Sequence, residues 1–213
     1  SRMPMQWQRI TATPLNFYGV GWSTIFADLD NDGWEDAFLA VGSGGFSQTA
    51  NKDQLFHNVQ GIFENVTLQS GALVQDLPTQ QAARIDFDRD GRLDLVLGHW
   101  NMGYRLYRNV SQNTNHWLEL TLEGGGPVNR GAVGALVEVL TPDGGRQRCE
   151  MRAGESRGSS HEPLLHFGLG VYPSAQVTIR WPDGVVEPLG TLAADQFHHR
   201  AYPAEMMIFR SSF

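Results

Sequence analysis

A nine-residue acidic pattern, D-x-D-x-D-G-x-x-D, occurs twice in the chain, at residues 28–36 and 86–94. Each copy gathers four carboxylates in a short segment, and their mutual repulsion calls for a hard cation as counter-charge. We therefore expect two calcium ions, one in each copy. The predicted ligands are the side chains of Asp28, Asp30, Asp32, Asp36, Asp86, Asp88, Asp90 and Asp94, with the backbone carbonyls of Trp34 and Arg92 at position 7.

The spacing differs from that of an EF-hand, whose loop carries a bidentate Glu at position 12. Position 12 is Leu39 in the first copy and Leu97 in the second, and neither side chain can bind calcium. The fourth carboxylate comes at position 9 instead, and short apolar runs flank the loops. We expect each loop to join two strands, with the glycine at position 6 permitting a sharp turn. The alternative, two acidic hairpin turns without an ion, is less consistent with two matching copies.

Composition favours an all-β protein and excludes some partners. The 213 residues include 24 glycines and only 18% charged residues, which is typical of many short strands joined by turns. The net charge is −7 and no basic run is present, so we expect no nucleic-acid partner. The single cysteine, Cys149, excludes an intrachain disulfide framework. No hydrophobic run reaches the length of a membrane span.

The calcium loops also bear on localisation. Loops without a bidentate Glu should bind calcium in the range that extracellular concentrations saturate. The chain begins Ser1-Arg2-Met3 without a recognisable signal peptide, as a processed secreted protein or a fragment would. We therefore expect a secreted or cell-surface protein.

The acidic loops belong to an internal repeat. Their first residues, Asp28 and Asp86, are 58 positions apart, and Leu55–Asn58 aligns with Leu106–Asn109. A repeat of this size accommodates four strands, as a propeller blade does.

These units resemble FG-GAP/VCBS repeats, the calcium-binding blades of integrin-type β-propellers. The resemblance is carried by Phe26–Gly33 with Asp36, and by Ile85–Gly91 with Asp94–Val96. Trp7–Thr11 is similar to the last strand of a preceding blade, as Phe63–Thr67 is in the first full one. Propellers close with about four to eight blades, so we expect further blades or another chain to complete this array.

The second half resembles an ASPIC/UnbV domain, which follows such repeats in the cartilage acidic protein family. This resemblance implies a small β-domain of unsettled molecular function. From the residues themselves, the alternation of Leu118, Leu120 and Leu122 with polar residues predicts a strand, and Pro-Asp-Gly turns predict hairpins. The motifs that carry the resemblance are Asn115–Leu118, Asn129–Ala135, His166–Gly170 and Ile179–Gly184.

The predicted fold is all-β, with two propeller-type four-stranded blades and a fraction of a third, followed by a small antiparallel β-sandwich or barrel. We expect the repeat region at 1–114, with blades at about 16–70 and 71–114. The ASPIC/UnbV-like domain is expected at 115–200, and an apolar tail or last strand at 201–213.

Polar residues in the second half could form a catalytic site, but simpler roles fit them better. Asn129 would fix a turn, Arg130 would pair with a carboxylate of the repeat half, and His166, near Glu162 in sequence, would be a hydrogen-bonded strand residue. We expect no catalytic residues and no enzyme.

The predicted function is an extracellular calcium-binding adhesion or structural module that binds other proteins or copies of itself, as a homo-oligomer or filament. The apolar tail 204–213 could pair with an exposed sheet edge. The alternative is a carbohydrate-binding or hydrolase accessory protein, with a ligand site in the second half.

Overall fold

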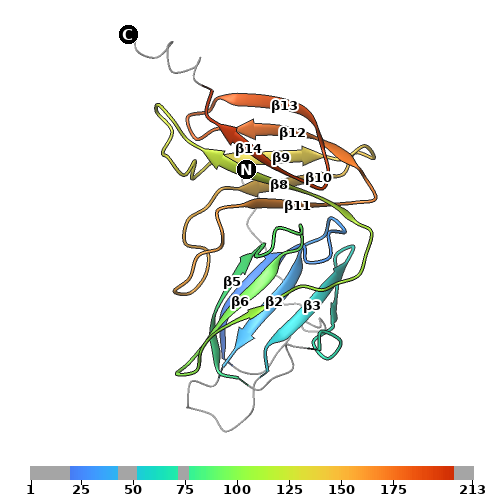
Figure 1. Cartoon of the computed structure of the whole chain (residues 1–213), viewed down its shortest axis with the longest axis vertical. Coiled ribbons are helices and arrows are strands. Elements are labelled where there is room, and N and C mark those ends of the chain that lie inside the picture. Colours follow the sequence, from blue (N-terminus) through green and yellow to red (C-terminus); the bar gives the residue numbers. More distant parts are fainter. Residues whose placement is uncertain (1–19, 43–51, 72–76, 204–213) are drawn as a thin grey trace, which may run out of the picture.

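The computed structural model describes residues 20–42, 52–71 and 77–203, and within these ranges the chain is all-β. The described residues form fourteen strands in four sheets, stacked as two halves along the long axis of the molecule (Figure 1). None of the described residues forms a helix long and apolar enough to cross a membrane. The Trp7–Thr11 segment and the 204–213 tail lie outside the described residues.

The first half consists of two small sheets with the same strand order, in agreement with the internal repeat. The first sheet has the order β1-β2-β3-β4 and the second the order β5-β6-β7, and all neighbouring strands are antiparallel. The second sheet thus has three described strands where the first has four. The strands are β1 (Gly21–Ala27), β2 (Asp36–Val41), β3 (Gln54–Val59), β4 (Ile62–Asn65), β5 (Thr79–Ile85), β6 (Asp94–His99) and β7 (Gly103–Tyr107).

The two sheets pack face to face, as neighbouring blades do. Alternate residues of a strand point to opposite faces, so only one face of each sheet supplies this shared core. The buried members are Ile25, Ala27, Phe38 and Ala40 from the first sheet, and Ala82, Leu93, Leu95 and Leu97 from the second sheet and the end of its acidic loop.

The second half is a β-sandwich. One sheet has the order β10-β9-β12-β13 and the other the order β11-β8-β14. Side chains from both sheets form one buried core, with Trp181 among its largest members. The strands are β8 (His116–Glu123), β9 (Leu136–Leu140), β10 (Arg146–Glu150), β11 (Leu165–Gly170), β12 (Ser174–Arg180), β13 (Val186–Ala193) and β14 (Gln196–Ala201).

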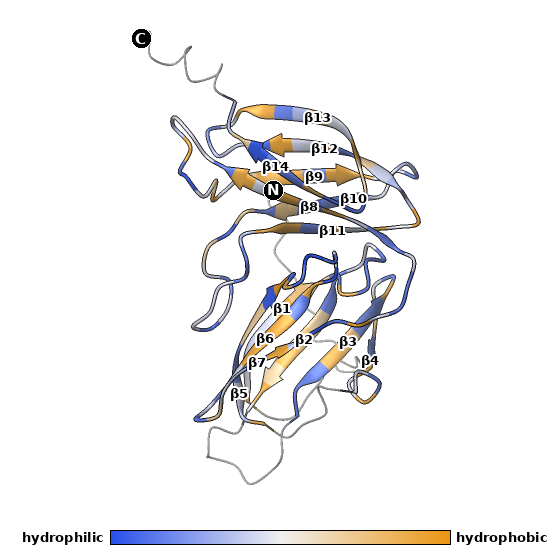
Figure 2. Cartoon of the chain, in the orientation of Figure 1, coloured by the Kyte–Doolittle hydropathy of each residue, from blue (hydrophilic) through white to orange (hydrophobic). Residues whose placement is uncertain are grey.

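One pairing departs from the expected antiparallel sandwich, because β14 runs parallel to β8. The hydrophobic alternation of a strand specifies which face is buried but not the direction of its neighbour. The strands hold most of the hydrophobic residues, whereas the segments between the halves are largely hydrophilic (Figure 2).

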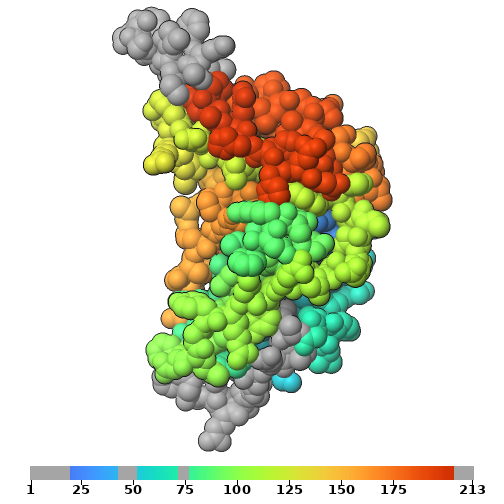
Figure 3. All heavy atoms as spheres, viewed as in Figure 1, coloured from blue at the N-terminus to red at the C-terminus, as the bar shows by residue number. Residues whose placement is uncertain are grey.

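The two halves are in contact, and the loop between β10 and β11 extends beside the first half (Figure 3). The Glu162 N–H donates to the carbonyl of Arg84 over 3.2 Å, and the Ser159 hydroxyl donates to the carbonyl of Ala82 over 2.9 Å. Both acceptors belong to β5, so this loop attaches the second half to the second blade.

Candidate calcium sites

The first acidic loop joins β1 to β2 and is closed by its own first carboxylate. Asp28 accepts hydrogen bonds from the backbone N–H of Gly33 over 2.7 Å and of Asp32 over 3.1 Å. Asn31 and Gly33 both have a positive φ. Asn and Gly adopt this backbone conformation more readily than other residues do. The expected sharp turn between two strands is therefore present.

This turn brings three of the predicted ligands of the first loop together. Carboxylate oxygens of Asp28, Asp30 and Asp36 lie within 4.8 Å of one another. Burial raises the pKa of Asp28 to about 8, and the negative charges of Asp32, Asp30 and Asp36 add to this shift. Burial likewise raises the pKa of Asp36 to about 6. Gathered, desolvated carboxylates of this kind fit a hard divalent cation that takes oxygen ligands.

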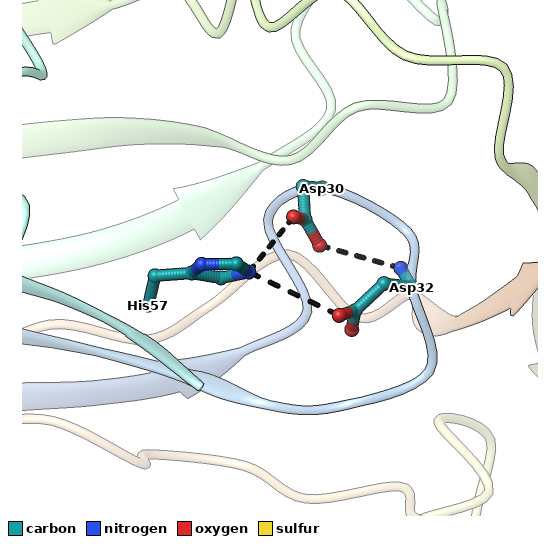
Figure 4. A group of neighbouring side chains, drawn as sticks. All are labelled: Asp30, Asp32 and His57. Atoms are coloured by element: carbon teal, nitrogen blue, oxygen red, sulfur yellow. Dashed lines mark hydrogen bonds and ion pairs between the residues drawn. The ribbon is translucent and has the colours of Figure 1, made fainter. Parts of the chain in front are cut away.

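The fourth carboxylate of the first loop, Asp32, lies outside the group of Asp28, Asp30 and Asp36. It is grouped with Asp30 and with His57 of β3 (Figure 4). The Nε2 atom of His57 lies 3.1 Å from Asp30 Oδ2 and 3.9 Å from Asp32 Oδ2. Partial burial and the charge of Asp30 raise the pKa of Asp32.

The second acidic loop joins β5 to β6 and repeats the same turn. Asp86 accepts hydrogen bonds from the N–H of Gly91 over 2.9 Å and of Asp90 over 3.2 Å. Carboxylate oxygens of Asp86, Asp88 and Asp90 lie within 4.8 Å of one another. Burial is the main cause that raises the pKa of Asp86 to about 6.

Two arginines pair with carboxylates of the second loop, whereas no described arginine pairs with those of the first. Arg108 contacts Asp88 over 2.6 Å and Asp90 over 3.1 Å, and the Arg92 guanidinium pairs with Asp90. Against the opposing effect of desolvation, the hydrogen bond and the charge of Arg108 hold the pKa of Asp88 below its usual range. The second loop therefore has counter-charges of its own.

The position-9 carboxylates, Asp36 and Asp94, anchor each loop to its blade. Asp36 accepts hydrogen bonds from the N–H of Leu29 and of Asn58, and Asp94 accepts the corresponding pair from Phe87 and Asn109. Asp94 lies outside the metal-sized group that the other three carboxylates form.

The position-7 residues were predicted to offer carbonyl ligands, and the structure places their N–H groups in the turn. The N–H of Trp34 donates to Asp32 over 2.8 Å, and that of Arg92 donates to Asp90 over 3.0 Å. The carbonyl ligand role of Trp34 and Arg92 stays a prediction.

Sequence reasoning missed two equivalent asparagines, Asn58 near the end of β3 and Asn109 just after β7. The Asn58 side chain donates to the carbonyl of Glu35 over 2.8 Å, and that of Asn109 donates to the carbonyl of Leu93 over 3.2 Å. Asn109 also donates to Leu29 of the first loop over 2.7 Å. Their equivalent positions in the repeat were a signal that could have identified them as supports of the loops.

A buried chain of three side chains joins the first loop to the second half. Asn31 donates from Nδ2 to the carbonyl of Gly91 over 2.9 Å, so its Oδ1 is the acceptor of the His166 Nε2–H over 2.7 Å. The neutral His166 ring then accepts at Nδ1 from Glu119, 2.8 Å away, which requires a protonated Glu119. Burial raises the pKa of Glu119 to about 8 and lowers that of His166 to about 3, in agreement with this neutral pair.

Both loops pack so closely on the second half that two glycines have no space for a side chain. A Cβ on Gly168 of β11 would lie 1.9 Å from Asp28 Oδ2. A Cβ on Gly91 of the second loop would lie 1.9 Å from the ring of Trp117. The acidic loops therefore form part of the junction between the halves.

The polar residues considered for catalysis do not converge. Asn129 holds a turn through two hydrogen bonds with the backbone of Val133, and His166 is a hydrogen-bonded strand residue, as expected. The expected pairing of Arg130 is wrong: its side chain is exposed and makes no ion pair with a described residue. Glu162 pairs with Arg89 of the second loop rather than with His166.

Comparisons with known proteins agree with this arrangement. A family model described as an FG-GAP-like repeat matches residues 28–97, and one described as ASPIC and UnbV matches residues 125–205. Cartilage acidic protein 1 of Mus musculus and of Homo sapiens are each 34% identical over 105 residues, and that of Xenopus tropicalis is 30% identical over 104 residues. The matches cover 46–47% of this chain but only 15–16% of those relatives.

Proposed function

Because the chain joins an FG-GAP-like repeat region to an ASPIC/UnbV domain and is homologous to cartilage acidic protein 1 over about half its length, we propose that it is a calcium-stabilised extracellular module that binds proteins. It acts without catalysis. The proposed boundary between its halves lies near residues 114 and 115.

Calcium binding is the first part of this proposal, and the close grouping of carboxylates in each of the two loops supports it. Asp28, Asp30, Asp32 and Asp36 would hold one ion with the carbonyl of Trp34, and Asp86, Asp88, Asp90 and Asp94 would hold the other with the carbonyl of Arg92. Burial raises the pKa of Asp28 and of Asp86, so without a cation these carboxylates lose their charge by binding a proton. A bound calcium ion would neutralise them in its place.

The loops would act as structural staples rather than signals, because they lie between strands and against the second half. Loops without a bidentate Glu should bind calcium weakly, in the range of about 10⁻⁴ to 10⁻³ M that extracellular modules use. An affinity in this range would suit the proposed extracellular location.

Thermal unfolding in millimolar calcium and in a chelator tests the calcium sites. A ligand that binds only the folded state raises the melting temperature, so calcium should stabilise the wild-type chain. Asp32→Ala and Asp90→Ala should each reduce this calcium increment. Asp143→Ala, in a hairpin of the second half, should leave the increment unchanged. A wild-type melting temperature that does not respond to calcium would refute the site assignment.

Protein binding is the second part, and the exposed face of the second blade supports it. Tyr104 and Leu106 lie on one face of β7 and are 74% and 42% exposed, and Trp100 and Met102 are exposed just before this strand. On the opposite face Tyr107 packs against the core shared with the first blade, and no described strand covers the outer edge of β7. Uncovered strand edges and apolar patches are common binding surfaces.

The partner that we propose for this face is a further β-sheet blade, including one from a second copy of the chain. Such a contact joins two different surfaces, so it closes into a ring or continues as a filament. Light scattering and electron microscopy in calcium should show particles larger than a monomer. Tyr104→Lys should reduce them, whereas Val171→Lys, an equally exposed site in the second half, should not. A wild-type chain that stays monomeric with and without calcium would contradict self-assembly.

A further inference from the structure

The ring of His57, a residue of β3, points toward Asp30 and Asp32 of the first acidic loop (Figure 4). Its Nε2 atom is shielded from solvent and lies 3.1 Å from Asp30 Oδ2 and 3.9 Å from Asp32 Oδ2 (Figure 4). The 3.9 Å contact is too long for a hydrogen bond, and Nε2 makes no hydrogen bond with any residue that the structure describes. The ring nitrogen and the two carboxylates are thus gathered without being paired as donor and acceptor.

The separations suit ligands of one metal ion. Zinc binds imidazole nitrogen and carboxylate oxygen at about 2.0–2.2 Å, so ligand atoms around one such ion lie about 3 to 4 Å apart. The two measured distances from Nε2 fall in this range. Imidazole is a preferred ligand of zinc and of the neighbouring transition ions, whereas calcium takes oxygen ligands.

The corresponding position in the second loop has a different chemistry. Arg108 occupies the place of His57 in the repeat and pairs with Asp88 and Asp90, the equivalents of Asp30 and Asp32. A guanidinium stays protonated and cannot bind a metal, whereas a neutral imidazole can. The same position therefore supplies a cation in one loop and a potential metal ligand in the other.

The two loops also differ in the net charge that would remain after one calcium ion binds. Each carries four carboxylates, and a single calcium ion would leave a charge of −2. In the second loop Arg92 and Arg108 offset this remainder. In the first loop no described arginine or lysine pairs with the four carboxylates, so a second divalent cation would neutralise the remaining charge of −2.

We propose that Asp30, Asp32 and His57 form a second metal site on the first loop that binds a zinc-class divalent cation. The site rests on the proposed calcium function, because Asp30 is shared with the group of Asp28 and Asp36 and Asp32 is also a proposed calcium ligand. The second loop has no equivalent of this site, because Arg108 stands at the position of His57.

Zinc uptake in saturating calcium tests the site directly. Equilibrium dialysis of the whole chain against ZnCl₂ should show about one more zinc ion per chain for wild type than for His57→Gln or His57→Arg. The control His116→Gln removes another histidine with a carboxylate neighbour, Asp195, and the same 33% side-chain exposure, and it should retain wild-type uptake. Equal uptake by wild type and His57→Gln would overturn the proposal.

A gain of binding provides the independent check. Arg108→His should give the second loop the donor set of the first and add about one zinc ion per chain. If Arg108→His binds no more zinc than wild type, the residue at this position of the repeat does not decide whether the loop binds zinc. Loss of the calcium-induced rise in melting temperature, with zinc uptake intact, would instead refute the calcium function alone, so the two failures are distinguishable.

Discussion

The Nε2–H of His166 donates to the Oδ1 of Asn31 over 2.7 Å, in the buried junction between the two halves. Asn31 thereby belongs at once to the first acidic loop and to the packing of the second half. Its side-chain amide also donates to the carbonyl of Gly91, so one residue connects both acidic loops to β11. An ion that orders the first loop should therefore also stabilise the junction.

Asn31→Ala should lower the free energy of unfolding by about 2–3 kcal/mol, because it leaves His166 and the Gly91 carbonyl unpaired in a buried site. Urea unfolding in calcium measures this change. Asn101→Ala is the matched control: Asn101 has a similar positive φ but lies in an exposed turn, so it reports backbone strain alone. Equal losses in the two variants would show that the hydrogen bonds contribute nothing.

Stability in a chelator should fall as pH rises from about 4 to about 8. The pKa of Asp28 is raised to about 8 in the folded chain, so between its unfolded value of 3.8 and 8 the folded state binds more protons than the unfolded state. Its favourable contribution is complete below pH 3.8 and is lost as pH rises through 8. Urea unfolding at several pH values measures the slope.

Calcium should flatten this slope, since the ion replaces the proton as counter-charge. Asp28→Asn should also flatten it, because the amide does not titrate. A slope in Asp28→Asn as steep as that of wild type would assign the pH dependence to other groups.

Gly168→Ala should destabilise the chain by about 3 kcal/mol and weaken calcium binding. The added Cβ would meet Asp28 Oδ2 at 1.9 Å and the backbone of Asn31 at 2.6 Å, so the first loop must move away from β11. Calcium titration followed by melting measures both effects. Gly131→Ala, also at a glycine without a positive φ, meets no atom closer than 3.7 Å and should cost little. Similar melting temperatures for the two variants would contradict close docking of the loop.

The sequence could predict the loops because the four carboxylates of each loop lie within nine residues and the flanking strands adjoin them. The D-x-D-x-D-G-x-x-D spacing specifies the turn that Asp28 and Asp86 close, and the repeat specifies a second sheet like the first. The apolar alternation of residues 118–122 likewise predicted β8. These features depend on local geometry, which a single segment determines.

The junction could not be predicted in the same way. His166 and Asn31 are 135 positions apart, and their contact depends on how two separately folded cores dock. Glu119 alternates with leucines as a solvent-facing residue would, yet it is fully buried because the first half covers that face. Similarly, the role of His57 became visible only when β3 placed it beside the loop.

Glu119→Gln should be tolerated, whereas Glu119→Ala should cost about 2 kcal/mol. In the folded chain the protonated Glu119 donates to His166 Nδ1, and the amide of glutamine can donate in its place. Alanine leaves that nitrogen buried without a donor. Nitrogen NMR of the His166 ring should show the Nε2–H tautomer in wild type and in Glu119→Gln, since Asn31 Oδ1 accepts from Nε2. If Glu119→Gln is as destabilising as Glu119→Ala, or if the ring is doubly protonated near neutral pH, Glu119 is ionised and the neutral pair is wrong.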